Sequence, residues 1–279
     1  MKRVWLGVAV AAAVGAVFAS LVVFVWTIDE THFDRPDESF DRLAARIEKT
    51  HGVTVDDSQR WVEAPTFSDP RSWIQLTVDE PDLPELLSTA CAADYPDPVD
   101  WSLRVATDNG SVVSLAAAPA GDVPCLDFGF DAPGLVAEIG RSVPNVELQA
   151  SIWDNGRFAL VVVDDDAGAL PALLPLVDHA EDVRDAAGLD TSEPVEINAA
   201  ALSVVIAADE HDRYLALLTD LAENHGVTSF SADVGTQTDG IGKVQIRASS
   251  RERDGIENAI RTSGLPIADL PVRFLPQTP

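Results

Sequence analysis

The amino-acid sequence repeats itself, and this repeat constrains the fold more than any other feature. Phe40–Thr54 and Tyr214–Thr228 share a helical pattern of apolar residues that ends in His-Gly-Val-Thr, at an offset of 174 residues. At half that offset, 87 residues, Leu83–Leu87 recurs as Leu170–Leu174. Self-similarity at a fixed period is typical of proteins built from stacked units. We therefore predict three units with a period near 87 residues.

Within each unit the pattern predicts the order helix, strand, strand, helix, strand. Apolar residues three and four apart indicate the helices, and Asp108-Asn109-Gly110 and Asp154-Asn155-Gly156 are hairpin turn signals. A kink is expected at Pro175. The predicted helices cover 37–50, 82–93, 132–143, 168–187, 209–224 and 252–263. The predicted strands cover 53–62, 72–78, 101–107, 111–117, 146–153, 157–163, 194–198, 202–207, 227–234, 242–249 and 270–275.

This element order is that of the split βαβ, or ferredoxin-like, arrangement. The predicted fold class is therefore α+β, with tandem ferredoxin-like units, antiparallel-rich sheets and helices on one face. Strand 111–117 can either open the second unit or close the first by hairpin pairing, and the sequence leaves both open. The predicted boundaries are unit 1 at 37–117, a linker at 118–130, unit 2 at 131–208, unit 3 at 209–275 and a tail at 276–279.

An uncharged run of 23 residues, Val4 to Trp26, follows Lys2 and Arg3. Such a run is long enough to cross a bilayer, and the positive-inside rule places its basic side in the cytoplasm. We therefore predict a cytoplasmic stub at 1–3, a transmembrane anchor at 4–26 and a linker at 27–36, with the rest of the chain extracytoplasmic at the cell membrane. The alternative is a signal peptide cleaved after Val17-Phe18-Ala19.

The charge balance excludes one class of partner. The chain has 46 acidic and 19 basic residues, a net charge of −27, and no cluster of Lys and Arg. A protein that binds nucleic acid needs such a cluster for the phosphates, so we expect no nucleic-acid partner. The 46% of hydrophobic residues is ample for packed cores.

Two cysteines, Cys91 and Cys125, fall in the part predicted to be extracytoplasmic. An isolated pair in an oxidising compartment usually forms a disulfide, so we predict this bridge. Closing its loop would stabilise the fold by roughly 4 kcal/mol in the chain-entropy model. The alternative is two buried thiols.

Few residues suggest a chemical site. His51 and His225 occupy equivalent positions, each before a glycine at a helix C-terminus, where the helix dipole favours a histidine. We interpret them as structural. Asp164, Asp165 and Asp166 are weak candidate metal ligands, for Ca²⁺, with helix capping as the alternative. The sequence contains no nucleophile elbow, P-loop or His-Glu-x-x-His motif, and we predict no catalytic or cofactor-binding residue.

These observations favour a non-enzymatic binding module of the cell envelope, whose repeated units contact a protein or a polymer. The reason is that repeated units occur without convergent catalytic groups. The alternative is an extracytoplasmic hydrolase that uses two carboxylates from Asp- and Glu-rich loops.

Overall fold

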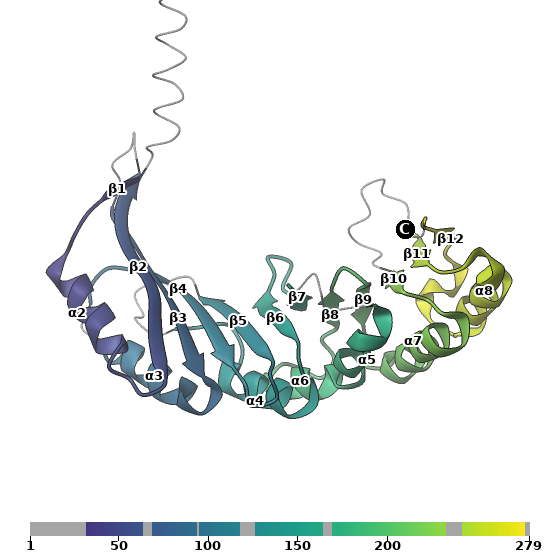
Figure 1. The fold of residues 1–279 in the computed structure, drawn as a ribbon, viewed down its shortest axis with the longest axis horizontal. Coiled ribbons are helices and arrows are strands. Elements are labelled where there is room, and N and C mark those ends of the chain that lie inside the picture. The colour runs from purple at the N-terminus through teal and green to yellow at the C-terminus, as the bar shows by residue number, and fades with distance from the viewer. Residues whose placement is uncertain are drawn as a thin grey trace, which may run out of the picture.

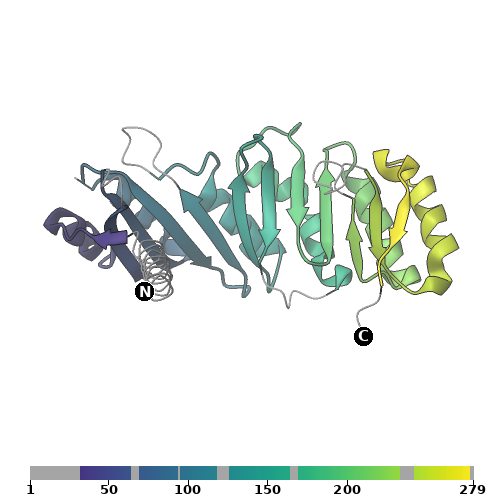
Figure 2. The same ribbon diagram turned by 90° about the horizontal axis from the view of Figure 1, so that it is seen from above.

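One sheet of twelve strands runs through the described part of the chain. The computed structural model describes residues 32–63, 69–93, 95–117, 126–163, 169–232 and 242–276. The strands lie in the sheet in the same order as in the sequence, from β1 to β12 (Figures 1 and 2). Every unit of the chain therefore adds its strands beside those of the unit before it.

The elements follow one another in a regular order. The strands are β1 (His32–Asp34), β2 (Val53–Glu63), β3 (Arg71–Asp79), β4 (Val99–Ala106), β5 (Val112–Ala117), β6 (Glu147–Ile152), β7 (Phe158–Val162), β8 (Val195–Asn198), β9 (Leu202–Ile206), β10 (Ser229–Ser231), β11 (Val244–Arg247) and β12 (Val272–Phe274). The α-helices are α2 (Glu38–Ile47), α3 (Leu83–Cys91), α4 (Ala132–Ser142), α5 (Leu170–Asp178), α6 (Ala180–Ala186), α7 (His211–His225) and α8 (Arg253–Thr262). Short 3₁₀ turns η1 (Glu80–Asp82), η2 (Ser250–Glu252) and η3 (Pro266–Asp269) accompany them.

The direction of pairing alternates along the sheet. Strands joined by a hairpin, such as β4 and β5, pair antiparallel, whereas strands joined through a helix, such as β5 and β6, pair parallel. The same alternation continues from β2 to β12. The repeating element is thus a ββα unit, a hairpin followed by a helix that leads to the next hairpin.

All the helices cover one face of the sheet. In Figure 1 they line the convex side of the curved sheet, and in Figure 2 the middle helices lie behind the strands while α2 and α8 lie at the two ends of the sheet. Strand β3 shows the consequence: Ile74, Leu76 and Val78 are buried, while the residues between them are only half-buried. Because side chains alternate across a strand, one face holds the core and the other remains open.

The two predicted hairpin turns are confirmed. Gly110 lies between β4 and β5 and Gly156 between β6 and β7, with φ angles of 84° and 79°. These left-handed angles cost other residues free energy but cost glycine none. The turn chemistry in the sequence therefore fixed two of the hairpins.

The prediction of tandem ferredoxin-like units is wrong. In that arrangement each unit closes its own sheet, whereas here all units share one mixed sheet of parallel and antiparallel pairs. The ββα unit is about half of the expected 87-residue period, since successive units begin their helices at Glu38, Leu83, Ala132, Leu170, His211 and Arg253. Offsets of 87 and 174 residues therefore correspond to two and four units.

Strand β5 shows how the two alternatives for 111–117 are resolved. It pairs antiparallel with β4 on one side and parallel with β6 on the other. It is the second strand of one hairpin, and it also pairs with the first strand of the next hairpin. The positions of the helices and strands themselves are confirmed to within a few residues, and the predicted kink is a break between α5 and α6 at His179.

The prediction of a transmembrane helix is corrected as well. None of the helices in the described ranges has both the length and the apolar character needed to cross a membrane. The predicted anchor, 4–26, lies outside those ranges.

Candidate functional site

The open face of the sheet, defined as the strand side chains that point away from the helices, is the largest candidate site. Its centre is a transverse row of side chains that are register partners from strand to strand between β2 and β12. The row consists of Thr54, Thr77, Arg104, Ser114, Gln149, Val161, Asn198, Ser203, Ser231, Gln245 and Arg273. All but Val161 are polar, and Thr54 and Arg273 at its ends are exposed.

Uncharged amides and hydroxyls dominate the middle of this row. They are half-buried, because neighbouring side chains on a sheet partly cover one another. Ser203 Oγ donates to Asn198 Oδ1 at 2.9 Å, and Asn198 Nδ2 donates to Glu196 Oε1 at 2.7 Å. The adjacent strands of a sheet lie about 4.8 Å apart, so the row presents hydrogen-bonding groups at regular intervals.

Ion pairs neutralise three carboxylates on the open face. Arg104 Nη1 lies 2.6 Å from Glu147 Oε1, and Arg157, one residue before β7, lies 2.6 Å from Glu196 Oε2. Near β3, Arg71 pairs with Asp100 at 3.4 Å. Glu196 is the most deeply placed of these acids, with only 1% of its side chain exposed.

The open face does not share the acidity of the chain. Strands β3 to β12 hold as many basic as acidic residues, namely Arg71, Arg104, Arg247 and Arg273 against Asp79, Asp100, Glu147 and Glu196. Strand β2, at one end of the row, adds the acidic residues Asp56, Asp57 and Glu63 and the basic residue Arg60. Most of the net charge of −27 is therefore carried outside the strands. From β3 to β12 the acidic and basic residues of the strands balance, and the open face lies on the concave side of the sheet (Figure 1).

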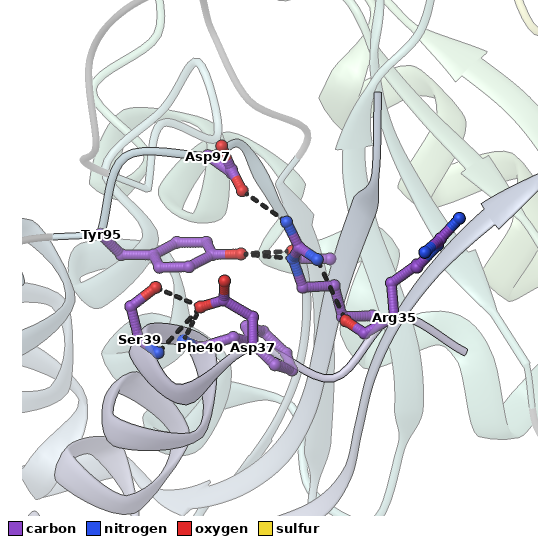
Figure 3. A network of polar contacts seen from close by, with 8 residues as sticks. Arg35, Asp37, Ser39, Phe40, Tyr95 and Asp97 are labelled. Carbon is purple, nitrogen blue, oxygen red and sulfur yellow. Dashed lines mark hydrogen bonds and ion pairs between the residues drawn. The ribbon is translucent and has the colours of Figure 1, made fainter. Parts of the chain in front are cut away.

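A second polar cluster ties the beginning of the described chain together (Figure 3). Arg60 on β2 has 12% of its side chain exposed and donates to Asp97 at 2.9 Å and to Tyr95 Oη at 3.2 Å. Burial opposes the charge of Arg60, but the hydrogen bonds to Asp97 and Tyr95 outweigh burial and raise its pKa. Tyr95 Oη also lies 2.8 Å from Ser72 Oγ.

The same cluster includes the start of α2. Asp37 caps this helix by accepting from the backbone N–H groups of Ser39 and Phe40. The Phe40 ring packs on the Tyr95 ring with centroids 5.7 Å apart. Because each polar group has a partner within the cluster, we interpret it as a structural latch between α2, β2 and the segment before β4.

The two histidines singled out in the sequence occupy equivalent places, as expected. Each faces a carboxylate at the start of the next helix: His51 Nδ1 lies 2.9 Å from Asp82 Oδ1, and His225 Nδ1 lies 3.2 Å from Glu252 Oε2. The hydrogen bond to Asp82 and its charge raise the pKa of His51. These recurring acidic partners were not foreseen from the sequence. The pairs connect neighbouring units and lie away from the open face.

The remaining predicted site residues lie at or beyond the edges of the described ranges. Asp164, Asp165 and Asp166 fall outside them, as does Cys125. Cys91 is half-buried at the end of α3 and is not a free thiol. No disulfide pair is seen among the described residues, so the bridge stays a prediction.

Comparison of the chain with protein-family models, with curated proteins and with solved structures found no match in any of the three. The architecture therefore defines the class of the protein: an array of ββα units that form one continuous sheet with one open face.

Sequence reasoning did not find the transverse row. Its members are common polar residues spaced at irregular intervals along the chain, and only the strand register brings them together. The available signal was the alternation of apolar and polar residues, for example in Ser72–Val78 and Val99–Ala106. That alternation predicts a strand with one solvated face but not which strands share it.

Proposed function

We propose that this protein is a non-enzymatic binding module that holds an extended, uncharged, hydroxyl-rich polymer on its open face. The transverse row carries this proposal. Its hydroxyl and amide groups extend over nearly the whole sheet, whereas a small-molecule site would gather its polar groups in one concave pocket. Regular spacing suits a ligand whose own polar groups recur at similar intervals.

The composition of the open face favours a polymer over a protein partner. Protein interfaces are anchored by aromatic, Met and Arg residues that become fully desolvated at the centre. On β5 to β10 the half-buried open-face positions lack aromatic residues, Met and Arg, and several of them carry a hydroxyl or an amide, as at Ser114, Gln149 and Ser203. Among the described residues the exposed large hydrophobics are Phe33, Ile152 and Val163, and they form no central anchor.

The charge distribution supports an uncharged ligand. The three carboxylates at the centre of the face, on Asp100, Glu147 and Glu196, each have an arginine partner. The acidic remainder of the chain would repel a polyanion. The same ion pairs do not favour the hydrolase alternative, because an arginine partner stabilises a carboxylate in its charged form and disfavours it as a general acid.

Co-sedimentation with insoluble neutral polysaccharides, cellulose and chitin among them, tests this proposal. We expect the wild-type protein to sediment with at least one of them. Ser114→Glu and Ser203→Glu each place an additional carboxylate on the row and should reduce binding at least tenfold. Ser88→Glu, on the exposed surface of α3, is the matched control and should bind as the wild type does.

Three outcomes would contradict the proposal. Equal sedimentation of the three variants would show that the open face is not used. Release of reducing ends from the bound polysaccharide would show a hydrolase. Failure to bind any polysaccharide, combined with cross-linking of one protein to the row, would establish a protein partner instead.

A further inference from the structure

A second site lies on the opposite side of the molecule, in the helical layer. Glu138 of α4, His179 at the α5–α6 junction and Asp182 of α6 each direct one ligand atom to a common point, with these atoms all within 4.8 Å of one another. The three side chains come from two successive ββα units. Their convergence therefore depends on how those units pack.

The backbone explains why His179 reaches this position. Pro175 lies inside α5, α5 ends at Asp178 and α6 begins at Ala180, so His179 is the residue between the two helices. Close packing then fixes α6 against α4: a Cβ on Gly134 would lie 2.2 Å from the carbonyl oxygen of Ala186. The Asp131 N–H also donates to the Ala187 carbonyl at 2.8 Å. The spacing between the two helices is thus held independently of the three side chains.

The surroundings of His179 match those of a metal-binding imidazole. Its Nδ1 lies 3.2 Å from Asp182 Oδ2, and its Nε2 lies 3.9 Å from Asp178 Oδ2. A histidine that binds a metal through one ring nitrogen usually directs the other N–H to a carboxylate, which fixes the tautomer and the orientation of the ring. Asp178 is the carboxylate nearest to Nε2, although at 3.9 Å it lies beyond hydrogen-bond distance, and Asp182 and Glu138 are placed as ligands.

Glu138 adds a buried negative charge to this group. Only 9% of its side chain is exposed, and its partner Arg141, one turn further along α4, is 71% exposed. An arginine so exposed can move away when a cation approaches. The excess of acidic over basic side chains around this point favours a divalent cation.

We propose that Glu138, His179 and Asp182 bind one Zn²⁺ ion, which joins α4 to the α5–α6 junction and so stabilises the contact between two units. One imidazole nitrogen and two carboxylate oxygens form a ligand set that Zn²⁺ accepts, whereas Ca²⁺ and Mg²⁺ prefer oxygen ligands alone. Water would complete the tetrahedral coordination. This proposal does not depend on the function proposed for the open face.

Titration calorimetry and thermal melting of the full chain with ZnCl₂ at pH 7.5 test the site, with CaCl₂ and MgCl₂ as comparisons. We expect one Zn²⁺ per chain, a higher melting temperature with zinc, and weak or no response to the other ions. His179→Gln should weaken zinc binding at least tenfold. Asp182→Asn should weaken zinc binding similarly. Because Asp182 is 66% exposed, this variant should remain folded even if His179→Gln unfolds the protein.

His225→Gln is the matched control, because His225 also faces two carboxylates, those of Asp220 and Glu252. It should bind zinc as the wild type does. If the wild type gives no zinc response, the three side chains do not bind zinc and the proposal is overturned. Equal loss in His179→Gln and His225→Gln would also overturn it, since it would indicate general binding to histidine and carboxylate pairs.

Discussion

At the scale of single residues, the open face combines polar groups that differ in how strongly they depend on their partners. Glu196 is almost completely buried, so removing its arginine leaves a carboxylate without solvent or counter-charge. Glu147 has 33% of its side chain exposed, and water can replace Arg104. The same chemical pair therefore contributes differently at two positions of one sheet.

We expect Arg157→Met to lower the free energy of unfolding by about 3 kcal/mol, because it leaves the buried carboxylate of Glu196 without its counter-charge. Arg104→Met is the matched variant and should cost less than about 1 kcal/mol, because its partner is solvated. Urea unfolding followed by circular dichroism measures both. The double variant Arg157→Met with Glu196→Gln should recover part of the loss. Equal costs for the two arginine variants would disprove this account.

His51 allows a pH-dependent prediction. Asp82 raises its pKa above the ordinary value of 6.5. The stabilisation that the pair provides is therefore complete below pH 6.5 and is lost as the pH rises through the folded-state pKa of His51. In Asp82→Asn the pKa of His51, followed by NMR of the imidazole C–H signals, should fall toward its ordinary value. A titration curve that does not move would mean that Asp82 is not the cause.

At the scale of elements, the hairpins define the unit and the helices connect the units. The two glycine turns are similar in sequence and backbone angle but differ in their surroundings. A Cβ on Gly110 would lie 2.9 Å from Asn145 Oδ1, on the segment that leads into β6, whereas nothing lies within 4 Å of a Cβ on Gly156. The first turn is thus packed against the next unit and the second is free of such contact.

Gly156→Ala should destabilise the protein by about 1 to 2 kcal/mol, the cost of a left-handed residue that carries a Cβ. Gly110→Ala should cost clearly more, because Asn145 must also move. Thermal and urea unfolding of the two variants give the comparison. If Gly110→Ala costs no more than Gly156→Ala, the turn does not hold the next unit in place.

At the scale of the whole molecule, stability comes from contacts between neighbouring units. Each hairpin pairs with the one before and after it, and in the helical layer α7 packs between α5 and α8. In such linear arrays stability is approximately a sum of unit and nearest-neighbour terms. Removing a terminal unit should therefore leave the rest folded, provided that the last remaining helix continues to cover the helix before it.

Two truncations test this. A chain that ends at Val227 loses β10, β11, α8 and β12 but keeps α7 on α5, and it should still unfold cooperatively. A chain that ends at Ala207 loses α7 as well and uncovers the side of α5 on which α7 packs. We expect it to be much less stable, or to aggregate. Circular dichroism and urea unfolding measure the difference. If the chain that ends at Val227 is completely unfolded, the array is one indivisible folding unit.

The sequence by itself determined the local structure of this protein. Apolar spacing fixed the helices, alternation fixed the strands, and Asp-Asn-Gly fixed two turns, because each of these signals acts within a few residues. It also determined that the molecule repeats, since Phe40–Thr54 matches Tyr214–Thr228.

Only the tertiary structure decided how the units join. A helix, a hairpin and a helix can close on themselves as a ferredoxin-like unit or add to a common sheet, and both give the same order of elements along the chain. The choice depends on whether β6 pairs with the free edge of β5. That pairing joins residues that are far apart in sequence, such as Ser114 and Gln149. The open face and the cluster around His179 follow from that choice, because each is formed by residues of different units and exists only after the units pack.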